Sequence, residues 1–525
     1  MLNYKKRMMK NLIRTKVLAL VALSAVLFFP SCSEDFLDRP PEDSYNIDEF
    51  YATDQQVIAA ANHLYSRPWF GFISNVSWPI GEIASGNART WDARNQEFSN
   101  YSISGSHGTL TQAWESLYAV VAQSNSVINT LPEAVSADVS EDIVNNSVAE
   151  ARFIRASAYF YLVRIFGSVP ILADNTEYVL EPVVPRNPVE DVYEFIRRDL
   201  EFAVENLNDR TIGTEFDRGR VSSNGAKAML AKVYLTQGNW SMAYEMAQEV
   251  IDSGEFRLLE DYNALFLEEN DNNDESIFAL QWSNSGEYSE GNAIQSFYAP
   301  AGVTGFSDGW AALGPTIDLQ EAYEENDTIR YYATIMEPGD FYPSINGGYT
   351  VPETINHQGT GVGIKKYVIG NPDSGGNEQS YPNNTYILRY ADLLLIHAEA
   401  AIRGGGSIEA GTESLNKVRA RAGLEPIENP TFEDVFHERR IELAFEMEFW
   451  YDVVRQGPEF AINYLGNVER GPWTDDTYSE VDPESYIPTQ DDLLYPYPDS
   501  ETQSNPALLE APVPYDFDNQ NGDNE

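Results

Sequence analysis

Residues 223–253 contain two short apolar stripes at helical spacing, separated by the turn Gly238-Asn239-Trp240. In both halves, SNGAKAMLAKVYLTQ and SMAYEMAQEVIDSG, apolar residues recur every three to four positions, which predicts two amphipathic helices. Small residues on the facing sides allow the helices to approach closely: Ala228, Ala231, Ala243 and Ala247. Because a single amphipathic helix cannot bury its stripe alone, such helices must stack and share a core.

The same period recurs elsewhere and predicts further helix pairs of uneven spacing. We expect them at 51–66 with 109–131, at 141–167 with 188–207, and at 386–421. The 223–253 pair resembles a tetratricopeptide hairpin, although the spacing is too irregular for a repeating solenoid. The sequence therefore predicts a mostly α fold on a tetratricopeptide-like scaffold of helix pairs.

Two long regions between the pairs, 67–108 and 270–384, are rich in Gly, Asn, Ser and aromatic residues and lack a helical period. Within them, 276–282 and 363–370 have the composition of short strands. Long loops inside a folded body usually carry function, because ordering them is entropically unfavourable. No long linker divides the chain, so we predict one body over 51–525 with a loop-rich, strand-poor half that binds ligand.

The N-terminus has the pattern of an export signal. A basic stretch precedes an apolar run from Val17 to Phe29, which ends in Pro30-Ser31-Cys32. As a helix this run would reach about 20 Å, short of the roughly 30 Å hydrocarbon core of a bilayer. We therefore predict a removable signal peptide over residues 1–31.

Cys32 is the only cysteine in the chain. Its position resembles the lipobox of bacterial lipoproteins, in which the cysteine carries the lipid anchor. The alternative is ordinary cleavage that leaves a free thiol, which would be a liability in an oxidising compartment. We predict lipidation of Cys32, followed by an acidic, proline-bearing tether over 32–50. Glu34-Asp35 resembles the export signal that sends some Bacteroidetes lipoproteins to the outer leaflet.

The charge of the chain restricts its partners. It has 34 Lys and Arg against 82 Asp and Glu, a formal net charge of −48. Such a chain is repelled by phosphate backbones, so no nucleic-acid partner is expected, and neutral ligands are favoured over polyanionic ones.

Glu438, Glu442 and Glu446 lie four residues apart and would share one helix face. A glycosidase would use two carboxyl groups across a substrate cleft. Apolar residues on the same helix indicate a packed position instead, and we predict a structural ion network with arginines from elsewhere: Arg389, Arg419 or Arg421. No catalytic residue is predicted.

The sequence also lacks the patterns of metal and cofactor sites. The five histidines form no HExxH or other close ligand cluster. The acidic loop 271–275 lacks the EF-hand register, and the glycines at 361–363 and 404–406 lack the setting of a phosphate-binding loop. We predict no metal and no cofactor.

Aromatic residues of the two loop-rich regions are the candidates for ligand contact. A sugar ring has apolar C–H faces and a hydroxyl rim, so its site needs a flat aromatic ring below and fixed polar groups at the edge. We predict seven ligand-binding residues, of which only some will touch the ligand: Trp78, Trp91, Arg94, Asn95, Trp282, Tyr288 and Trp310. The alternative is that they are core or partner-facing residues.

Several segments together resemble the SusD/RagB family of Bacteroidetes outer-membrane nutrient-binding lipoproteins. They are CSEDFLD (32–38), AWESLY (113–118), EARFIRA (150–156), YFYLVRIFGSVP (159–170), RVS (220–222), YILRYADLLLIHAEA (386–400), LNKVRARAG (415–423), HERRIELAFE (437–446), WYDVVR (450–455) and LYPYP (494–498). The resemblance extends almost from end to end of the chain.

The resemblance implies a lid-like protein on a SusC-like TonB-dependent transporter of the outer membrane, anchored by lipid, exposed at the cell surface and without catalysis. It also implies capture of oligosaccharides or peptides for import. The loop aromatics favour a neutral oligosaccharide. A RagB-like peptide receptor of the same architecture remains open, and so does a surface glycoside hydrolase.

Overall fold

The computed structural model describes residues 51–518, apart from 181, 211–217, 356–357 and 476–477, together with Met8 and Met9. The predicted signal cleavage site, Cys32 and the tether over 32–50 lie outside the described residues. The chain divides into two compact units, Met1–Tyr51 and Ala52–Glu525, and the second contains the elements below. Among the described residues, none of the helices is both long enough and apolar enough to span a bilayer.

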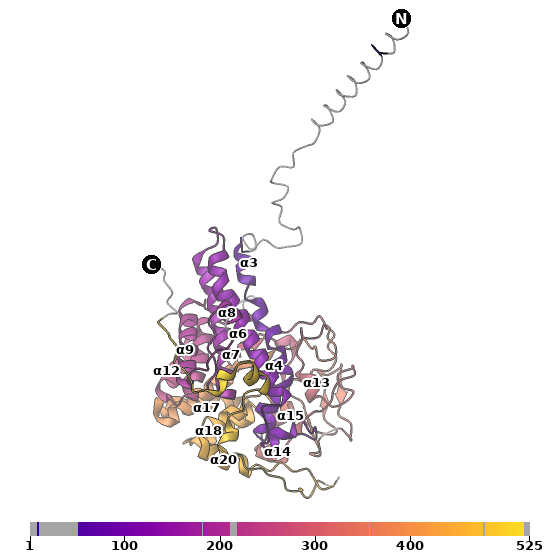
Figure 1. Cartoon of the computed structure of the whole chain (residues 1–525). Coiled ribbons are helices and arrows are strands. Elements are labelled where there is room, and N and C mark those ends of the chain that lie inside the picture. The colour runs from indigo at the N-terminus through magenta and orange to yellow at the C-terminus, as the bar shows by residue number, and fades with distance from the viewer. Residues whose placement is uncertain are drawn as a thin grey trace. The chain divides into compact units, whose positions relative to one another are not determined.

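The second unit is built on long helices (Figure 1). They are α6 (Gly108–Ala134), α7 (Glu141–Phe166), α9 (Val189–Asn206), α11 (Ser223–Thr236), α12 (Trp240–Ser253), α16 (Tyr390–Ala400), α17 (Ile408–Arg421), α18 (Phe432–Glu442) and α20 (Pro458–Asn467). Shorter α-helices are α3 (Asp54–Ala59), α4 (Phe70–Asn75), α5 (Gln96–Ser99), α8 (Asn175–Leu180), α13 (Ile294–Tyr298), α14 (Ile317–Ala322), α15 (Thr328–Thr334), α19 (Phe449–Val454) and α21 (Asp499–Ser504).

Local side chains fix where these helices begin and end. The hydroxyls of Ser140 and Ser222 accept hydrogen bonds from the first turns of α7 and α11 and so satisfy backbone donors that have no partner inside the helix. Gly167, with φ of 73°, follows the end of α7. In the turn between α11 and α12, Gly238 has φ of 72° and the Asn239 side chain caps α12.

The long helices stack in order, each sharing its buried face with the next. α7 packs against both α6 and α9, α9 against α11, α11 against α12, α12 against α16, and α16 against α17. Ala228, Ala231, Ala243 and Ala247 are fully buried between α11 and α12 or their neighbours. The mostly helical scaffold of paired helices is confirmed.

Two details of the predicted helix pairs differ from the structure. The segment 51–66 forms only the short α3 and a 3₁₀ turn at Asn62–Tyr65, and α3 packs against α7, whereas α6 has α7 as its main partner. Residues 385–389, placed mostly at the start of a helix by the sequence, form a strand. The β-favouring run Thr-Tyr-Ile-Leu pairs there with another strand and is buried on both faces.

The strands are few and short. β2 (Ser276–Leu280) pairs antiparallel with β8 (Thr385–Arg389), with Ser276 opposite Arg389 and Leu280 opposite Thr385. The remaining ladders have two residues per strand: β1 (Ala88–Arg89) with β3 (Gly314–Pro315), β4 (Ile335–Met336) with β7 (Gly363–Ile364), and β5 (Phe341–Tyr342) with β6 (Tyr349–Thr350). The predicted strand at 363–370 is thus limited to its first two residues.

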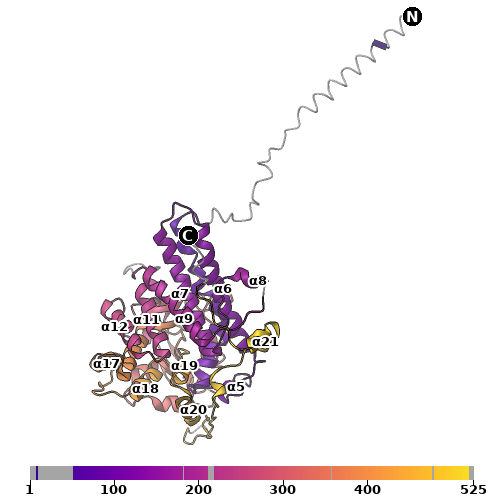
Figure 2. The same ribbon diagram turned by 60° about the vertical axis from the view of Figure 1, so that its left-hand side comes forward.

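The region 67–108, predicted as loop, also contains helical turns. They are a 3₁₀ turn at Arg67–Trp69, α4, a π-helical turn at Pro79–Ala84 and α5. In Figure 1 the loops around α13 lie together on the right, and α9, α12 and α17 lie on the left; Figure 2 shows the helical side from a second direction. The molecule therefore has a helical scaffold and a separate half made of loops and short elements.

Candidate functional site

A cleft of about 940 Å³ opens where the two loop-rich regions meet the beginning of α6. Its aromatic wall consists of Trp78, Phe297 and Trp310, and its polar rim includes Asp92, Arg94 and Asn95. Polar side chains at the start of α6 and just before it complete the lining, among them His107, Thr109 and Gln112. We call this feature the tryptophan cleft.

The three rings of the aromatic wall support one another. The ring centroid of Phe297 lies 5.1 Å from that of Trp78 at an interplanar angle of 34°, and 5.0 Å from that of Trp310 at 69°. The Trp78 indole N–H donates to the carbonyl oxygen of Ser74 at 2.8 Å, and the residue is only 2% exposed, so its ring is a fixed support of the wall. Trp310 is 37% exposed, so its ring is available to a ligand that enters the cleft.

The rim is held by a small network around Asp92. Its carboxylate accepts hydrogen bonds from the Arg94 backbone N–H at 3.1 Å, the Arg94 guanidinium at 3.0 Å and the Asn95 amide at 3.3 Å. Burial raises the pKa of Asp92, but the hydrogen bonds from Arg94 outweigh it and hold that pKa below its usual value. The carboxylate therefore stays ionised and orients two donor groups at the edge of the cleft.

His107 joins this rim to the helical scaffold. The backbone N–H of Thr109 donates to His107 Nδ1 at 3.2 Å, so Nε2 carries the proton and donates to the Arg94 carbonyl at 2.9 Å. The imidazole thus caps the start of α6 and at the same time fixes the loop that presents Arg94. An aromatic wall with fixed amide, guanidinium and carboxylate groups beside it suits a ligand with apolar faces and a hydroxylated rim.

Four of the seven predicted ligand-binding residues line this cleft: Trp78, Arg94, Asn95 and Trp310. The other three lie elsewhere. Trp91 is 56% exposed and has the Arg89 guanidinium over its ring at 5.5 Å. Tyr288 is exposed and packs edge-on against Phe70 at 5.0 Å.

Trp282 is a packed residue of the loop-rich half. It is buried, and its indole N–H donates to the Thr385 hydroxyl at 2.9 Å, which joins the end of β2 to the start of β8. Its ring is engaged with the Phe70 ring edge-on at 6.4 Å. Trp282 does not line the tryptophan cleft, and its contact with a ligand stays a prediction.

The sequence did not single out Phe297 or the polar residues at the start of α6. Phe297 belongs to α13, more than two hundred residues along the chain from Trp78, and no local pattern indicates that the two rings meet. Gln112 and Thr109 belong to a segment whose helical period indicated scaffold only.

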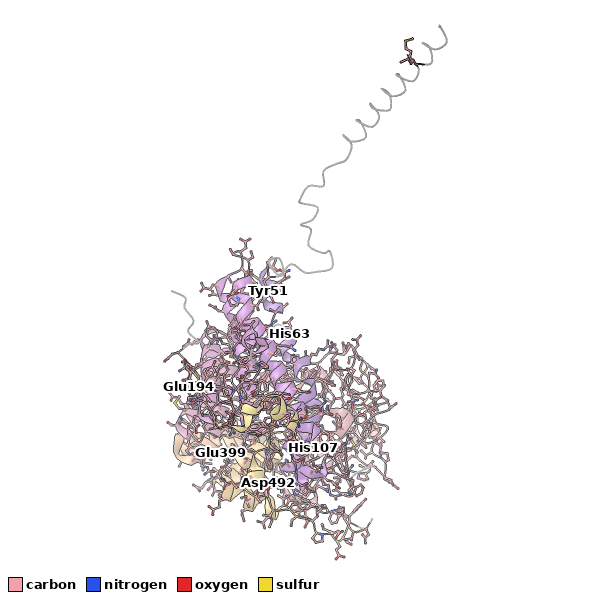
Figure 3. All side chains as sticks on the ribbon, viewed as in Figure 1. Tyr51, His63, His107, Glu194, Glu399 and Asp492 are labelled. Carbon is pink, nitrogen blue, oxygen red and sulfur yellow. The ribbon has the colours of Figure 1, made fainter. Side chains whose placement is uncertain are left out.

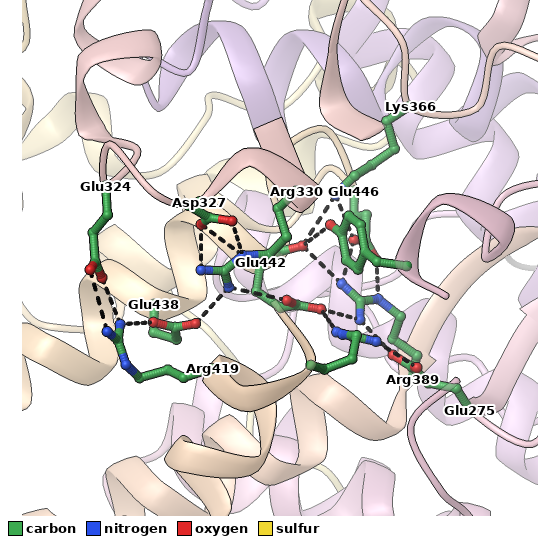
Figure 4. Close-up of polar contacts among 12 residues, drawn as sticks. Glu275, Glu324, Asp327, Arg330, Lys366, Arg389, Arg419, Glu438, Glu442 and Glu446 are labelled. Carbon is green, nitrogen blue, oxygen red and sulfur yellow. Dashed lines mark hydrogen bonds and ion pairs between the residues drawn. The ribbon is translucent and has the colours of Figure 1, made fainter. Parts of the chain in front are cut away.

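The predicted ion network is confirmed (Figure 4). Glu442 is bound by Arg389 at 2.6 Å and also by Arg421 and Arg330. Glu438 is bound by Arg419 at 2.9 Å and by Arg330 at 2.5 Å. Glu446 is bound by Arg389 at 2.7 Å and by Lys366 at 3.0 Å. Burial raises the pKa of Glu442, but the guanidinium groups of Arg421, Arg389 and Arg330 outweigh it and keep that pKa well below its usual value. These carboxylates are fully paired and do not line the cleft.

In the part of the chain that the structure describes, no three His, Cys, Asp or Glu side chains gather in a group that could hold a metal ion. The fold and the tryptophan cleft together define a helical scaffold protein with an aromatic-walled cleft in its loop-rich half.

Comparisons with known proteins place this class in a family. The model of the SusD family matches residues 274–513, and a model described as "Starch-binding associating with outer membrane" matches residues 35–235. A SusD-like protein of Bacteroides ovatus is 35% identical over 95% of this chain and 98% of its own. The chain belongs to the SusD family.

Two solved structures show the same fold with related sequences. One, a crystal structure with xylogluco-oligosaccharide, is 33% identical with a TM-score of 0.78 and covers 88% of this chain and 99% of that one. The other, a laminarin-binding SusD-like protein, is 27% identical with a TM-score of 0.69 and covers 86% of this chain and 96% of that one.

Proposed function

We propose that this protein captures neutral oligosaccharides in the tryptophan cleft and delivers them to a SusC-like TonB-dependent transporter in the outer membrane. The observation that carries the proposal is the arrangement of Trp78, Phe297 and Trp310 beside the Asp92-centred rim. Indole faces stack on the apolar faces of sugar rings, and fixed donors and acceptors at the rim bind hydroxyl groups.

The relatives support this ligand class. A related protein was crystallised with xylogluco-oligosaccharide and another is described as laminarin-binding, and both ligands are neutral glucans. The formal net charge of −48 repels polyanionic chains such as polyuronates, which favours a neutral ligand further. A RagB-like peptide receptor would be expected to offer a long open strand edge. In the described residues, the two five-residue strands β2 and β8 are buried along their whole length, and the remaining strands have two residues each.

Isothermal titration with a panel of neutral oligosaccharides, peptides and uronate oligomers tests the ligand class. Trp310→Ala should raise Kd for the bound glycan about tenfold or more, because a few aromatic residues usually dominate the affinity of a binding site. Trp240→Ala, which removes an indole from the scaffold helix α12, is the matched control and should leave Kd unchanged. Binding of peptides alone would overturn the glycan proposal.

Absence of hydrolysis is part of the proposal. The buried carboxylates of α18 are held by arginines and do not line the cleft, so they are not placed as an acid and base pair across it. We expect oligosaccharides to be recovered intact after long incubation with the protein. Release of shorter products, retained after purification to homogeneity, would instead support a glycoside hydrolase.

The lipid anchor at Cys32 is the second part of the proposal. It is supported by the N-terminal sequence pattern and by the matching family model, which is described as associating with the outer membrane. Labelling with radioactive palmitate should mark the wild-type protein, and Cys32→Ala should remove the label and release the protein from membranes. An unlabelled wild-type protein that stays on the membrane would contradict the anchor.

A further inference from the structure

A second, smaller cavity of about 280 Å³ lies beside the tryptophan cleft. Its lining includes Phe98, Tyr101, Ile103, Asp492, Leu494 and Tyr495, so it combines aromatic rings with a carboxylate. Ligand pockets usually span about 300–1,000 Å³. The volume of the tryptophan cleft is at the upper end of that range. The second cavity is much smaller and has room for about one sugar ring.

The two cavities share a wall. Glu97 lines the cleft and the next residue, Phe98, lines the second cavity; in the same way Ile103 lines the second cavity and Ser104 lines the cleft. The Phe98 ring also contacts the His107 ring edge-on, with centroids 5.3 Å apart. The wall between the two cavities is therefore formed by a single short segment, 97–104.

Polar groups of the second cavity are held in place by their neighbours but can still form further hydrogen bonds. Asp492 Oδ2 accepts hydrogen bonds from the backbone N–H and the hydroxyl of Thr489, both at 2.7 Å, while its Oδ1 has no hydrogen bond with a described residue. Tyr495 is 7% exposed, and its ring is fixed between Phe98 at 5.7 Å and Trp450 at 5.7 Å.

The Tyr495 hydroxyl makes no hydrogen bond with any of the residues described, although the residue is nine-tenths buried and lines the cavity. The hydroxyl oxygen keeps access to solvent at the cavity wall, so it is a candidate for contact with a ligand. His107 of the cleft and Asp492 of the second cavity are both labelled in Figure 3.

We propose that the second cavity is a subsite for one further sugar ring of the same ligand, a terminal or branching unit that passes over segment 97–104. The inference rests on the proposed function of the tryptophan cleft. The ring would pack against the exposed Leu494 side chain, the Tyr495 hydroxyl would donate to a ring or hydroxyl oxygen, and Asp492 Oδ1 would accept from a sugar hydroxyl. The carboxylate selects neutral or amino sugars over uronates in this position.

The experiment compares long and short glycans on variants that alter only the second cavity. Leu494 is 45% exposed at its mouth, so Leu494→Arg should fill the entrance without removing buried packing. Leu509→Arg, at a leucine that is 69% exposed and lines neither cavity, is the matched control. Tyr495→Phe removes the hydroxyl and keeps the ring. Circular dichroism and thermal melting establish that each variant is folded.

The probes are xylogluco-oligosaccharide and laminarihexaose as long ligands, and cellotriose and laminaritriose as short ones. For whichever long ligand binds, Leu494→Arg should raise Kd roughly tenfold, which is equivalent to the loss of one ring contact. The Kd for the corresponding short ligand should stay unchanged. Tyr495→Phe should raise the long-ligand Kd about threefold, as expected for one lost hydrogen bond. Leu509→Arg should change neither value.

The outcomes separate the two proposals. Equal long-ligand affinities for Leu494→Arg and Leu509→Arg would overturn the subsite and leave the tryptophan cleft intact. An equal loss for long and short ligands would also overturn it, because the effect would then act through the cleft. If the wild-type protein binds no glycan of the larger panel, the proposed function fails and this inference fails with it.

Discussion

The helical scaffold and the loop-rich half of this molecule are stabilised in different ways. In residues 108–253, none of the described non-glycine residues has a positive φ, and buried pairs such as Arg155 with Asp199 at 2.8 Å join regular helices. Between 270 and 384, seven of the described non-glycine residues have a positive φ, and Gly309 with φ of 85° precedes Trp310. Positive φ is unfavourable for residues with a Cβ, so the surrounding contacts must hold these loops in place.

This difference shows how the site is made. The scaffold needs only stacked amphipathic helices, and its stability comes from burial. The loop-rich half presents the rings and rim of the cleft, and it is joined to the scaffold by the ion network around Arg389, at the junction of β8 and α16. The junction, rather than either half, should therefore be the most sensitive part of the fold.

The largest effect is expected at that junction. Arg389→Ala removes the partner of Glu275, Glu442 and Glu446, which are buried. Each carboxylate keeps another cation, from Arg421, Arg330 or Lys366, but removing one partner from buried ion pairs destabilises a protein by about 3–5 kcal/mol. Urea unfolding followed by circular dichroism measures the loss. Arg67→Ala, at an exposed pair with Glu290, is the control and should change stability by less than about 1 kcal/mol. Similar losses of stability for both variants would show that the junction is no more sensitive than an exposed ion pair.

Glu82 in the loop-rich half should make stability fall as the pH rises. Burial raises its pKa from 4.5 to about 7, although Asn87 and the Met447 backbone donate hydrogen bonds to it. The folded state therefore binds the proton more tightly than the unfolded state, and this contribution is complete below pH 4.5 and lost as the pH passes through 7.

Glu82→Gln should remove this dependence. The free energy of unfolding of the wild type, minus that of the variant, should decrease between pH 4.5 and 7 by up to about 1.4 kcal/mol per pH unit. A difference that stays flat over this window would show that Glu82 titrates normally.

His397 in the scaffold should have the opposite slope. Burial lowers its pKa from 6.5 to about 4, and its ring stacks on Tyr244 with centroids 4.4 Å apart. The folded state holds the neutral imidazole, so this contribution is complete above pH 6.5 and is lost as the pH falls towards 4. Unfolding of the wild type and of His397→Gln between pH 4 and 7 measures it, and we expect a change comparable in size to that for Glu82 because the two pKa values move by similar amounts. A slope of the same sign as that of Glu82 would refute the assignment.

The smallest effect concerns Trp91, which was predicted to bind ligand but does not line the cleft. Its exposed indole lies next to Asp92 of the rim, so it is placed to contact only an outer part of a ligand. Trp91→Ala should raise Kd about two- to fivefold, less than Trp310→Ala, since central buried residues dominate binding. Titration of both variants with the same glycan compares their Kd values. A larger rise in Kd for Trp91→Ala would show that the ligand lies mainly against Trp91 and not against Trp310.

The sequence predicted the scaffold well because amphipathic periodicity is a local property. The same logic predicted the ion network, since carboxylates four residues apart on an apolar helix require cations. It failed at 385–389, where an unbroken apolar run continues from strand into helix and periodicity does not separate the two.

The site was predicted only in part. Loop composition identified Trp78, Arg94, Asn95 and Trp310, but it equally suggested Trp282, whose engagement with Thr385 depends on strand pairing. Phe297 and the second cavity depend on contacts between segments far apart in the chain, such as Phe98 with Tyr495. Such contacts leave no pattern in any local stretch of sequence.

A crystal structure of the protein soaked with xylogluco-oligosaccharide or laminarihexaose, whichever binds in titration, tests the central claim most directly. We predict a sugar ring lying across Trp310 in the tryptophan cleft, with hydroxyl groups bound by Arg94 and Asn95. Density for the glycan on another surface, with the cleft filled only by solvent, would contradict it.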